Sequence, residues 1–401
     1  MIERSERFIF LFSFSAFLCI SLQLIWSSDV ITNVKKLANN DINPVYASPE
    51  RGHKRQRMCI LAGPHKTGTS SVQANMYRWS KRTINFIDTE TDFPPDPILN
   101  WIWPVPLTIA KIESNDTKTF NWSPAKIYYP MMEALIPLKR RSKRTLFKKY
   151  TATEISGMYR DTLSAYWNEG NDIVFGTEAM DLIVKFPDGP SMLHTISDNI
   201  LPNTIEGRDV TAVVMYRTPK INHLLSIWHE NCNKQSDPKF YEWITTTSNT
   251  FGPIDSLGMV DMMLKETNWN IVLIDLNMVR LDDWDISNFV ACKVLGEDCA
   301  NKTLKGLNGA KPVVKNVRKN DRDPNVPNRT LDEIDAVLKS YDCNYQHLSH
   351  TNTSRLEIFY PYGLRETMST CEEQGVNGYP LSRGEMKDQI EKIALKHGKL
   401  W

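Results

Sequence analysis

The sequence predicts an α/β fold, a P-loop-like parallel sheet flanked by helices, preceded by an N-terminal transmembrane anchor. Short apolar runs typical of buried strands alternate with longer segments of helical periodicity. Groups able to bind phosphate follow two of these runs, and ligand sites of such sheets lie at strand carboxyl ends. The strands are expected at Met58–Ala62, Thr83–Asp88, Asp172–Gly176, Asp209–Arg217 and Trp269–Leu276.

The composition narrows the class of protein. The 401 residues include 48 Lys and Arg and 47 Asp and Glu, so the net charge does not indicate nucleic acid as a partner. A hydrophobic content of 41% supports a normal core. We expect one catalytic domain, residues 57–401. Cysteine and histidine spacings do not suggest a zinc site.

An uncharged stretch, Phe8–Trp26, lies close to the N-terminus. It is long enough to cross a bilayer as a helix and longer than the apolar region of a cleaved signal peptide. We therefore expect an uncleaved signal anchor with a cytoplasmic tail at residues 1–7. A polar stem at 27–56 would join the anchor to a lumenal domain.

Two further features agree with a lumenal domain. Five Asn-x-Ser/Thr acceptor sites for glycosylation are present, at Asn115, Asn121, Asn301, Asn328 and Asn352. Cysteine pairs Cys292 with Cys299 and Cys343 with Cys371 are plausible disulfides in an oxidising compartment. The sequence alone leaves the pairing open, because free buried thiols would also suit these positions.

The segment after the first strand predicts an anion cradle. Gly63-Pro64 is a turn signal, and a helix with apolar spacing begins at Thr69. The unpaired first-turn amides and the helix dipole favour an anion, while Gly68 allows close approach and Lys66 adds charge. The residues expected around the phosphate are Gly63, Lys66, Thr67, Gly68, Thr69, Ser70 and Ser71.

A second anion-binding group is expected after the fourth strand. That strand ends at Arg217, and Thr218 and Pro219 suit the N-cap and first position of a following helix. Ser226 would lie about two turns along this helix. A guanidinium fork and a hydroxyl together suit a phosphate.

The order of the first motif differs from a Walker loop, because Lys66 precedes Gly68. The Gly63-x-x-Lys66-x-Gly68 motif resembles the 5′-phosphosulfate loop of sulfotransferases that use 3′-phosphoadenosine 5′-phosphosulfate (PAPS). The segment His65-Lys66-Thr67-Gly68 is similar to this loop in the Golgi carbohydrate branch of these enzymes. Arg217 and Ser226 resemble the 3′-phosphate site, although their separation is nine residues instead of the usual eight.

This resemblance implies an activity and its parts. The chain would transfer a sulfuryl group from PAPS to a carbohydrate hydroxyl in the Golgi lumen, without a metal. The pattern Phe175-Gly-Thr-Glu-Ala-Met, at the end of the third strand, resembles the strand-end Ser-Glu segment of some carbohydrate sulfotransferases. Its Glu178 is therefore the first choice for the base, with His65 second. Glu178 could equally be a helix-capping carboxylate. Lys315 and Arg318 lie in a basic loop that would close over the nucleotide.

Three questions remain open at this level. Residues 93–129 read as an irregular surface segment whose tryptophans, Trp101, Trp103 and Trp122, either stack on sugar rings or form a satellite core. The basic cluster 139–149 is either a solvated helix face or a contact for an acidic glycan. Asp283-x-Asp285 and Asp321-x-Asp323 permit a metal-dependent glycosyltransferase, and a non-catalytic lumenal scaffold is the third possibility. The acceptor and the oligomeric state are not specified.

Overall fold

The structure is a computed structural model, and the chain forms two compact units, residues 1–54 and 55–401. The structure describes residues 55–64, 69–82, 97–106, 109, 124–136, 149–231, 240, 243, 255–307, 312, 328–350, 354–359, 364, 371 and 381–397. The predicted anchor at 8–26 and nearly all of the predicted stem lie outside these residues. None of the described helices is both long and apolar enough to cross a membrane.

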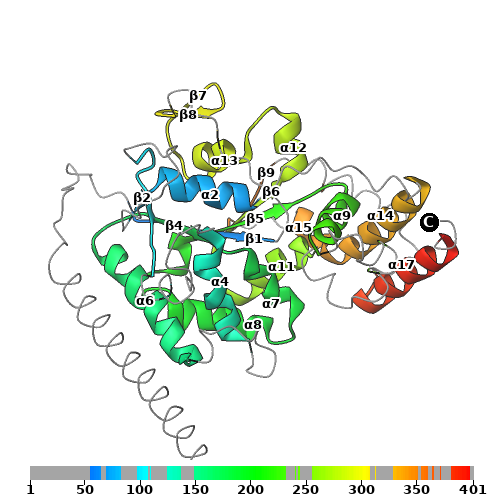
Figure 1. The fold of residues 1–401 in the computed structure, drawn as a ribbon, viewed down its shortest axis with the longest axis horizontal. Coiled ribbons are helices and arrows are strands. Elements are labelled where there is room, and N and C mark those ends of the chain that lie inside the picture. Colours follow the sequence, from blue (N-terminus) through cyan, green and yellow to red (C-terminus); the bar gives the residue numbers. More distant parts are fainter. Residues whose placement is uncertain are drawn as a thin grey trace, which may run out of the picture. The chain divides into compact units, whose positions relative to one another are not determined.

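One parallel sheet forms the centre of the second unit, which confirms the α/β prediction. Among the described residues it has seven strands in the order β2-β3-β4-β1-β5-β6-β9 (Figure 1), and every neighbouring pair is parallel. The strands are β1 (Met58–Gly63), β2 (Lys81–Arg82), β3 (Ile102–Trp103), β4 (Ile173–Gly176), β5 (Val210–Tyr216), β6 (Asn270–Asp275) and β9 (Leu356–Phe359). A hairpin of β7 (Cys299–Ala300) and β8 (Thr303–Leu304) is separate.

The central strands are continuous apolar runs because both of their faces are covered. Every residue of β1 and β4 is buried, as is nearly every residue of β5 and β6. Figure 1 shows α2 (Thr69–Trp79), α12 (Leu276–Leu281) and α13 (Ile286–Phe289) on one side of the sheet and α6 (Ala152–Asn168), α7 (Leu182–Lys185) and α8 (Gly189–Thr195) on the other. The sheet is thus enclosed between helical layers, as parallel sheets require.

Local sequence signals explain several helix boundaries. Thr151 accepts a hydrogen bond from the Glu154 amide, and Glu154 accepts one from the Thr151 amide, which forms a complete capping box at the start of α6. Asp255 caps α11 (Ser256–Glu266) in a similar way through the Gly258 amide. The other described elements are α4 (Pro124–Leu135), η2 (Glu178–Asp181), η3 (Ile196–Ile200), η4 (Gly207–Asp209), η5 (Val290–Val294), η6 (Cys343–Tyr345) and α15 (His347–His350).

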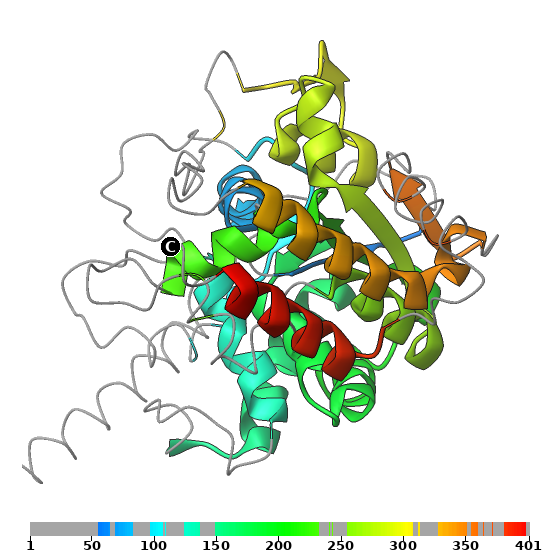
Figure 2. The ribbon, with the colours of Figure 1, turned by 90° about the vertical axis from the view of Figure 1, so that its right-hand side faces the viewer.

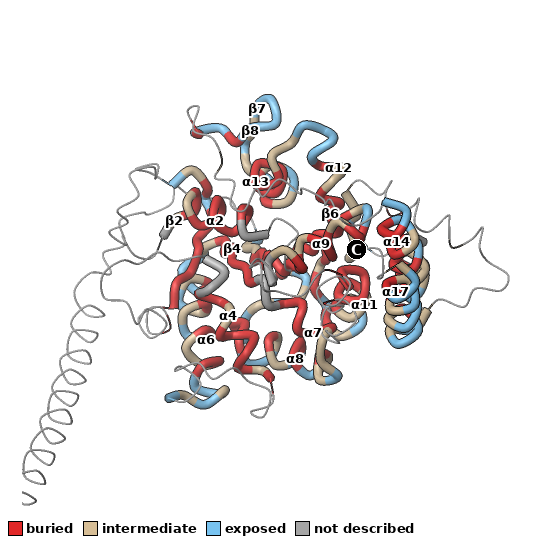
Figure 3. The backbone as a smooth tube through the Cα atoms, turned by 45° about the vertical axis from the view of Figure 1, so that its right-hand side comes forward, coloured by how far each residue is buried: buried red, intermediate tan, exposed pale blue. Residues whose placement is uncertain are grey.

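A second apolar core lies beside the sheet. It joins α9 (Lys220–Asn231), α14 (Asn328–Asp342) and α17 (Arg383–His397) through buried side chains that include Leu224, Ile334 and Ile390. Figure 2 shows α14 and α17 lying side by side, and Figure 3 shows their outer faces exposed and their inner faces buried. This core therefore fixes the helix that begins just after Arg217.

Both predicted disulfides are present. Cys292 is bonded to Cys299, and Cys343 is bonded to Cys371. Cys59 is a buried free thiol in β1. The first bridge closes a short loop at the β7–β8 hairpin, and the second holds the residue that follows α14.

The structure decides several local points that the sequence left open or placed differently. The sequence left Trp101 and Trp103 open between sugar stacking and a core, and both are buried, so they belong to the core and do not present a sugar-stacking face. The segment 93–129, expected to be irregular, contains β3 and the start of α4. Residues 286–294 form α13 and η5, and α12 ends before them at Leu281. The helix after Arg217 begins at Lys220, and Thr218 bonds elsewhere in the fold instead of capping it.

Candidate anion-binding site

The strand order brings the two predicted phosphate-binding motifs to one edge of the sheet. β4, β1, β5 and β6 are neighbours and run in the same direction, so their carboxyl ends lie together. In the register, Gly63 at the end of β1 is opposite Val214 of β5, and Tyr216 of β5 is opposite Asp275 of β6. Neighbouring strands are only about 4.8 Å apart. The segments that follow Gly63 and Tyr216 thus leave adjacent positions of the same edge.

The first motif is described only at its two ends. Gly63 closes β1 with φ of 100°, a conformation that favours glycine, and α2 begins at Thr69. Thr69 and Ser70 lie in the first turn of α2, and Ser71 is buried there. His65, Lys66, Thr67 and Gly68 lie outside the described residues. The ends nevertheless define a strand, a short connection and a helix N-terminus, which is the arrangement that can bind an anion.

Arg217 is a buried cation without a buried anion. Only 6% of the residue is exposed, and its Nη1 donates to Ser226 Oγ over 2.7 Å. Its Nε atom is buried with no hydrogen-bond partner, and no described carboxylate forms an ion pair with the guanidinium. The pKa of Arg217 is lowered from 12.5 to about 10, mainly by burial and secondly by the positive charge of Arg280. A buried charge left unpaired in this way is typical of a site that receives a charged ligand.

Ser226 completes this arrangement despite the nine-residue separation. Its hydroxyl accepts from Arg217 and donates to the Asn222 carbonyl over 2.8 Å, so its position on α9 is fixed from both sides. The structure therefore brings these two predicted residues into direct contact.

The sequence prediction missed Arg280. This residue lies in the last turn of α12, the helix that follows β6, and it is exposed. Although much of its surface is exposed, the protein atoms around the guanidinium displace part of its hydration and so lower its pKa, and the carboxylate of Asp285 opposes that effect. Arg280 is close enough to Arg217 to disfavour the charged form of Arg217. The two arginines lie near each other only because β5 and β6 are neighbours in the sheet. A basic residue five positions after the end of a strand does not by itself indicate this proximity.

Asp275 and Thr218 connect the ends of these two strands. Thr218 donates its hydroxyl proton to Asp275 Oδ2 over 2.6 Å, while Asp275 Oδ1 accepts from the Asn277 and Met278 amides and caps α12. Burial raises the pKa of Asp275, although these hydrogen bonds oppose the shift. Asp275, the last residue of β6, is thus occupied by capping α12. Arg217, at the end of the neighbouring strand β5, is left unpaired.

The predicted base lies at the same edge. Glu178 is the first residue of η2, directly after β4 and Thr177, although its side chain lies outside the described residues. Gly176 before it cannot be enlarged easily, since a Cβ there would lie 2.6 Å from Leu61 Cβ and 2.8 Å from the Leu61 carbonyl oxygen. The same Cβ would lie 3.0 Å from Nε2 of Gln73, a fully buried amide without a hydrogen-bond partner. The sequence had not indicated Gln73.

The expected closing loop and the two Asp-x-Asp motifs contain the remaining predicted residues. Lys315 and Arg318, the expected closing loop, lie outside the described residues, as does Asp321-x-Asp323. Asp285 caps α13 through the Ser287 and Asn288 amides at 2.9 and 3.0 Å. One carboxylate of the alternative Asp-x-Asp motif is therefore occupied as a helix cap.

A cleft of about 630 Å³ opens at the opposite, amino-terminal edge of the sheet. It lies by the starts of β5 and β6 and is lined in part by His194, Glu266 and Trp269. It contains none of the predicted residues, and His194 and Glu266 are bonded to each other across 3.1 Å. The cleft is thus distinct from the site around Arg217.

Comparison with protein-family models, with curated proteins and with solved structures finds no match to this chain. The function is therefore inferred from the residues and their geometry.

Proposed function

We propose that this protein transfers a sulfuryl group from PAPS to a hydroxyl of a carbohydrate acceptor. The observation that carries the proposal is the buried, unpaired Arg217, hydrogen-bonded to Ser226 at the same sheet edge as the Lys66 motif. A cation in this setting needs an anionic partner. The two motifs on adjacent strands suit the two phosphate-bearing ends of one nucleotide, in a P-loop-like arrangement.

Each residue has a defined task in this proposal. Arg217 and Ser226 bind the 3′-phosphate, and Arg280 adds a second positive charge to their surroundings. The amides and hydroxyls of Thr69, Ser70 and Ser71, with Gly63, Thr67 and Gly68, hold the 5′-phosphate. Lys315 and Arg318 close over the bound nucleotide.

The reaction is an in-line displacement at sulfur. The acceptor oxygen forms a bond to sulfur while the bond from sulfur to the nucleotide phosphate oxygen breaks, and adenosine 3′,5′-bisphosphate leaves. Glu178, or His65 in its place, takes the proton of the acceptor hydroxyl. Lys66 neutralises the charge that develops on the leaving oxygen. As in phosphoryl transfer, positioning and charge stabilisation supply most of the catalysis.

The cellular setting belongs to the same proposal. A type II anchor at 8–26 would place the domain in the Golgi lumen, where disulfides persist. The two disulfides agree with this setting, as do two glycosylation acceptor sites that are exposed, Asn301 and Asn328.

Binding and transfer test the proposal separately. The wild-type protein should show a thermal shift with adenosine 3′,5′-bisphosphate and none with uridine diphosphate and Mn²⁺. Arg217→Ala and Lys66→Ala should each lose transfer of labelled sulfate from PAPS to a mixture of glycans. Arg208→Ala is the control, because it removes an exposed guanidinium at the opposite edge of the sheet. Undiminished transfer by Arg217→Ala would exclude its role, and a response to uridine diphosphate alone would favour the glycosyltransferase.

A further inference from the structure

We propose that Asp342, at the end of α14, is a positioning residue that holds Arg217 in its orientation toward the 3′-phosphate. This inference rests on the proposed function. Asp342 is fully buried and lies more than a hundred residues beyond Arg217 in the chain. It nevertheless bonds to residues on both sides of Arg217.

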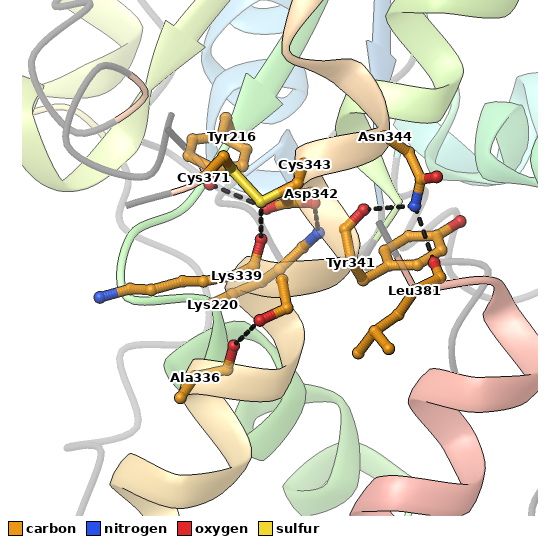
Figure 4. Close-up of a disulfide and its surroundings, with 11 residues drawn as sticks. Tyr216, Lys220, Ala336, Lys339, Tyr341, Asp342, Cys343, Asn344, Cys371 and Leu381 are labelled. Atoms are coloured by element: carbon orange, nitrogen blue, oxygen red, sulfur yellow. Dashed lines mark hydrogen bonds and ion pairs between the residues drawn. A yellow bond between two sulfur atoms is a disulfide. The ribbon is translucent and has the colours of Figure 1, made fainter. Parts of the chain in front are cut away.

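The contacts enclose the arginine segment. Tyr216, the residue before Arg217, donates its hydroxyl proton to Asp342 Oδ2 over 3.0 Å. Lys220, three residues after Arg217, donates to Asp342 Oδ1. Figure 4 shows the Tyr216 and Lys220 side chains converging on Asp342 beside the disulfide of Cys343. One carboxylate therefore fixes both flanks of the turn that presents Arg217.

Two other carboxylates secure the same segment. Asp335, on α14 two turns before Asp342, accepts a hydrogen bond from the Ile221 amide over 2.9 Å, which satisfies a donor at the start of α9. Asp275 accepts from Thr218. Three carboxylates thus bind the flanks of Arg217 without neutralising its guanidinium.

The Lys220–Asp342 pair is costly to bury, which indicates a purpose other than stability. Both side chains are almost entirely buried, with 2% and 0% exposed. A buried ion pair contributes little net stability compared with an apolar pair of similar volume, because both charges lose their hydration. It does, however, specify one geometry. Burial raises the pKa of Asp342, and the positive charge of Lys220 opposes that shift.

The end of α14 is held from the other side as well. Cys343 follows Asp342 directly and is bonded to Cys371. Lys220 Nζ also lies 5.5 Å from the centre of the Tyr341 ring, the residue before Asp342. The second core and the disulfide therefore give Asp342 a rigid support from which to orient the Arg217 turn.

The decisive variant is Lys220→Met with Asp342→Leu, which replaces the pair by apolar side chains of similar size. This double variant should remain folded, because it removes both charges of the pair together and leaves neither of them buried alone. We expect its affinity for adenosine 3′,5′-bisphosphate to fall about tenfold, whereas its affinity for adenosine 5′-monophosphate should stay unchanged. Isothermal titration calorimetry with both nucleotides measures this difference. Tyr216→Phe, which leaves the ion pair in place, should show a smaller loss of the same selective kind.

The outcomes separate this inference from the proposed function. If the wild-type protein does not prefer the bisphosphate to the monophosphate, the proposed function fails. If the wild-type protein has that preference and both variants keep it in full, the positioning role of Asp342 is wrong. An equal loss for both nucleotides would show a general structural role and would also overturn it.

Discussion

The guanidinium of Arg217 donates to the Ser226 hydroxyl over 2.7 Å, although the two residues are nine positions apart and the usual spacing is eight. Because α9 begins at Lys220, Ser226 lies in its second turn and faces back toward the end of β5. The hydroxyl is neutral, so the contact orients the guanidinium without cancelling its charge.

Replacing Arg217 by methionine should stabilise the ligand-free protein. A pKa lowered from 12.5 to about 10 means that the fold disfavours the charged form, by on the order of 3 kcal/mol. We expect the free energy of unfolding to rise by about 1–3 kcal/mol near neutral pH, as measured with urea. The folded-state pKa lies below the unfolded one, so the penalty is fully present below about pH 10 and fades as the pH rises further.

A pH profile and an exposed control variant test this prediction. The advantage of Arg217→Met should shrink between about pH 10 and pH 11, and Arg208→Met, at an exposed position, should show no such advantage. A large loss of stability in Arg217→Met would mean that an anionic group of the protein already neutralises Arg217.

Gly176 should not tolerate alanine. The added methyl group would lie 2.6 Å from Leu61 Cβ and 2.8 Å from a backbone oxygen of the central strand, and neither can move without disturbing the sheet. We expect a destabilisation of about 1–3 kcal/mol in chemical unfolding. Gly157→Ala in α6 is the matched control, because no atom beyond its chain neighbours and its own helix backbone lies within 4 Å of its added Cβ. That control should be stabilised by up to about 1 kcal/mol, so similar losses in both variants would contradict the packing argument.

The two disulfides should differ in their contribution to stability. Their cysteines are 28 and 7 residues apart, and in the chain-entropy treatment the loops correspond to about 3.5 and about 2.5 kcal/mol. Replacing Cys343 and Cys371 by alanine should therefore lower the free energy of unfolding more than replacing Cys292 and Cys299. Thermal unfolding of the two double variants under oxidising conditions makes the comparison. The reverse order would show that the loop-length term does not dominate.

Cys59 should remain unreactive in the folded protein. Burial raises the pKa of this thiol from 9.0 to about 12, and only the thiolate is nucleophilic. At pH 8.5, iodoacetamide should label the Cys59 peptide in urea but not in native buffer, as followed by mass spectrometry. Rapid native labelling would show that β1 opens or that the thiol is accessible. Cys59→Ala, if folded, identifies the labelled peptide.

Local sequence predicted the parts of this fold whose signals are local. The apolar run of β1, the capping residues Thr151 and Glu154 and the periodicity of α6 each act within a few residues. The short strands β3 and β9 were missed, because two to four residues carry too little pattern and obtain their hydrogen bonds from neighbouring strands. Trp101 and Trp103 were similarly ambiguous until the fold buried them.

By itself, the sequence determined the α/β class, the two cysteine pairs that could bond and the residue types able to bind phosphate. Tertiary structure alone decided that β1 lies between β4 and β5, that Arg280 is near Arg217, and that Asp342 fixes the flanks of Arg217. The reason is physical: strand order and buried charge pairing depend on packing between residues far apart in the chain, which periodicity and short motifs do not encode.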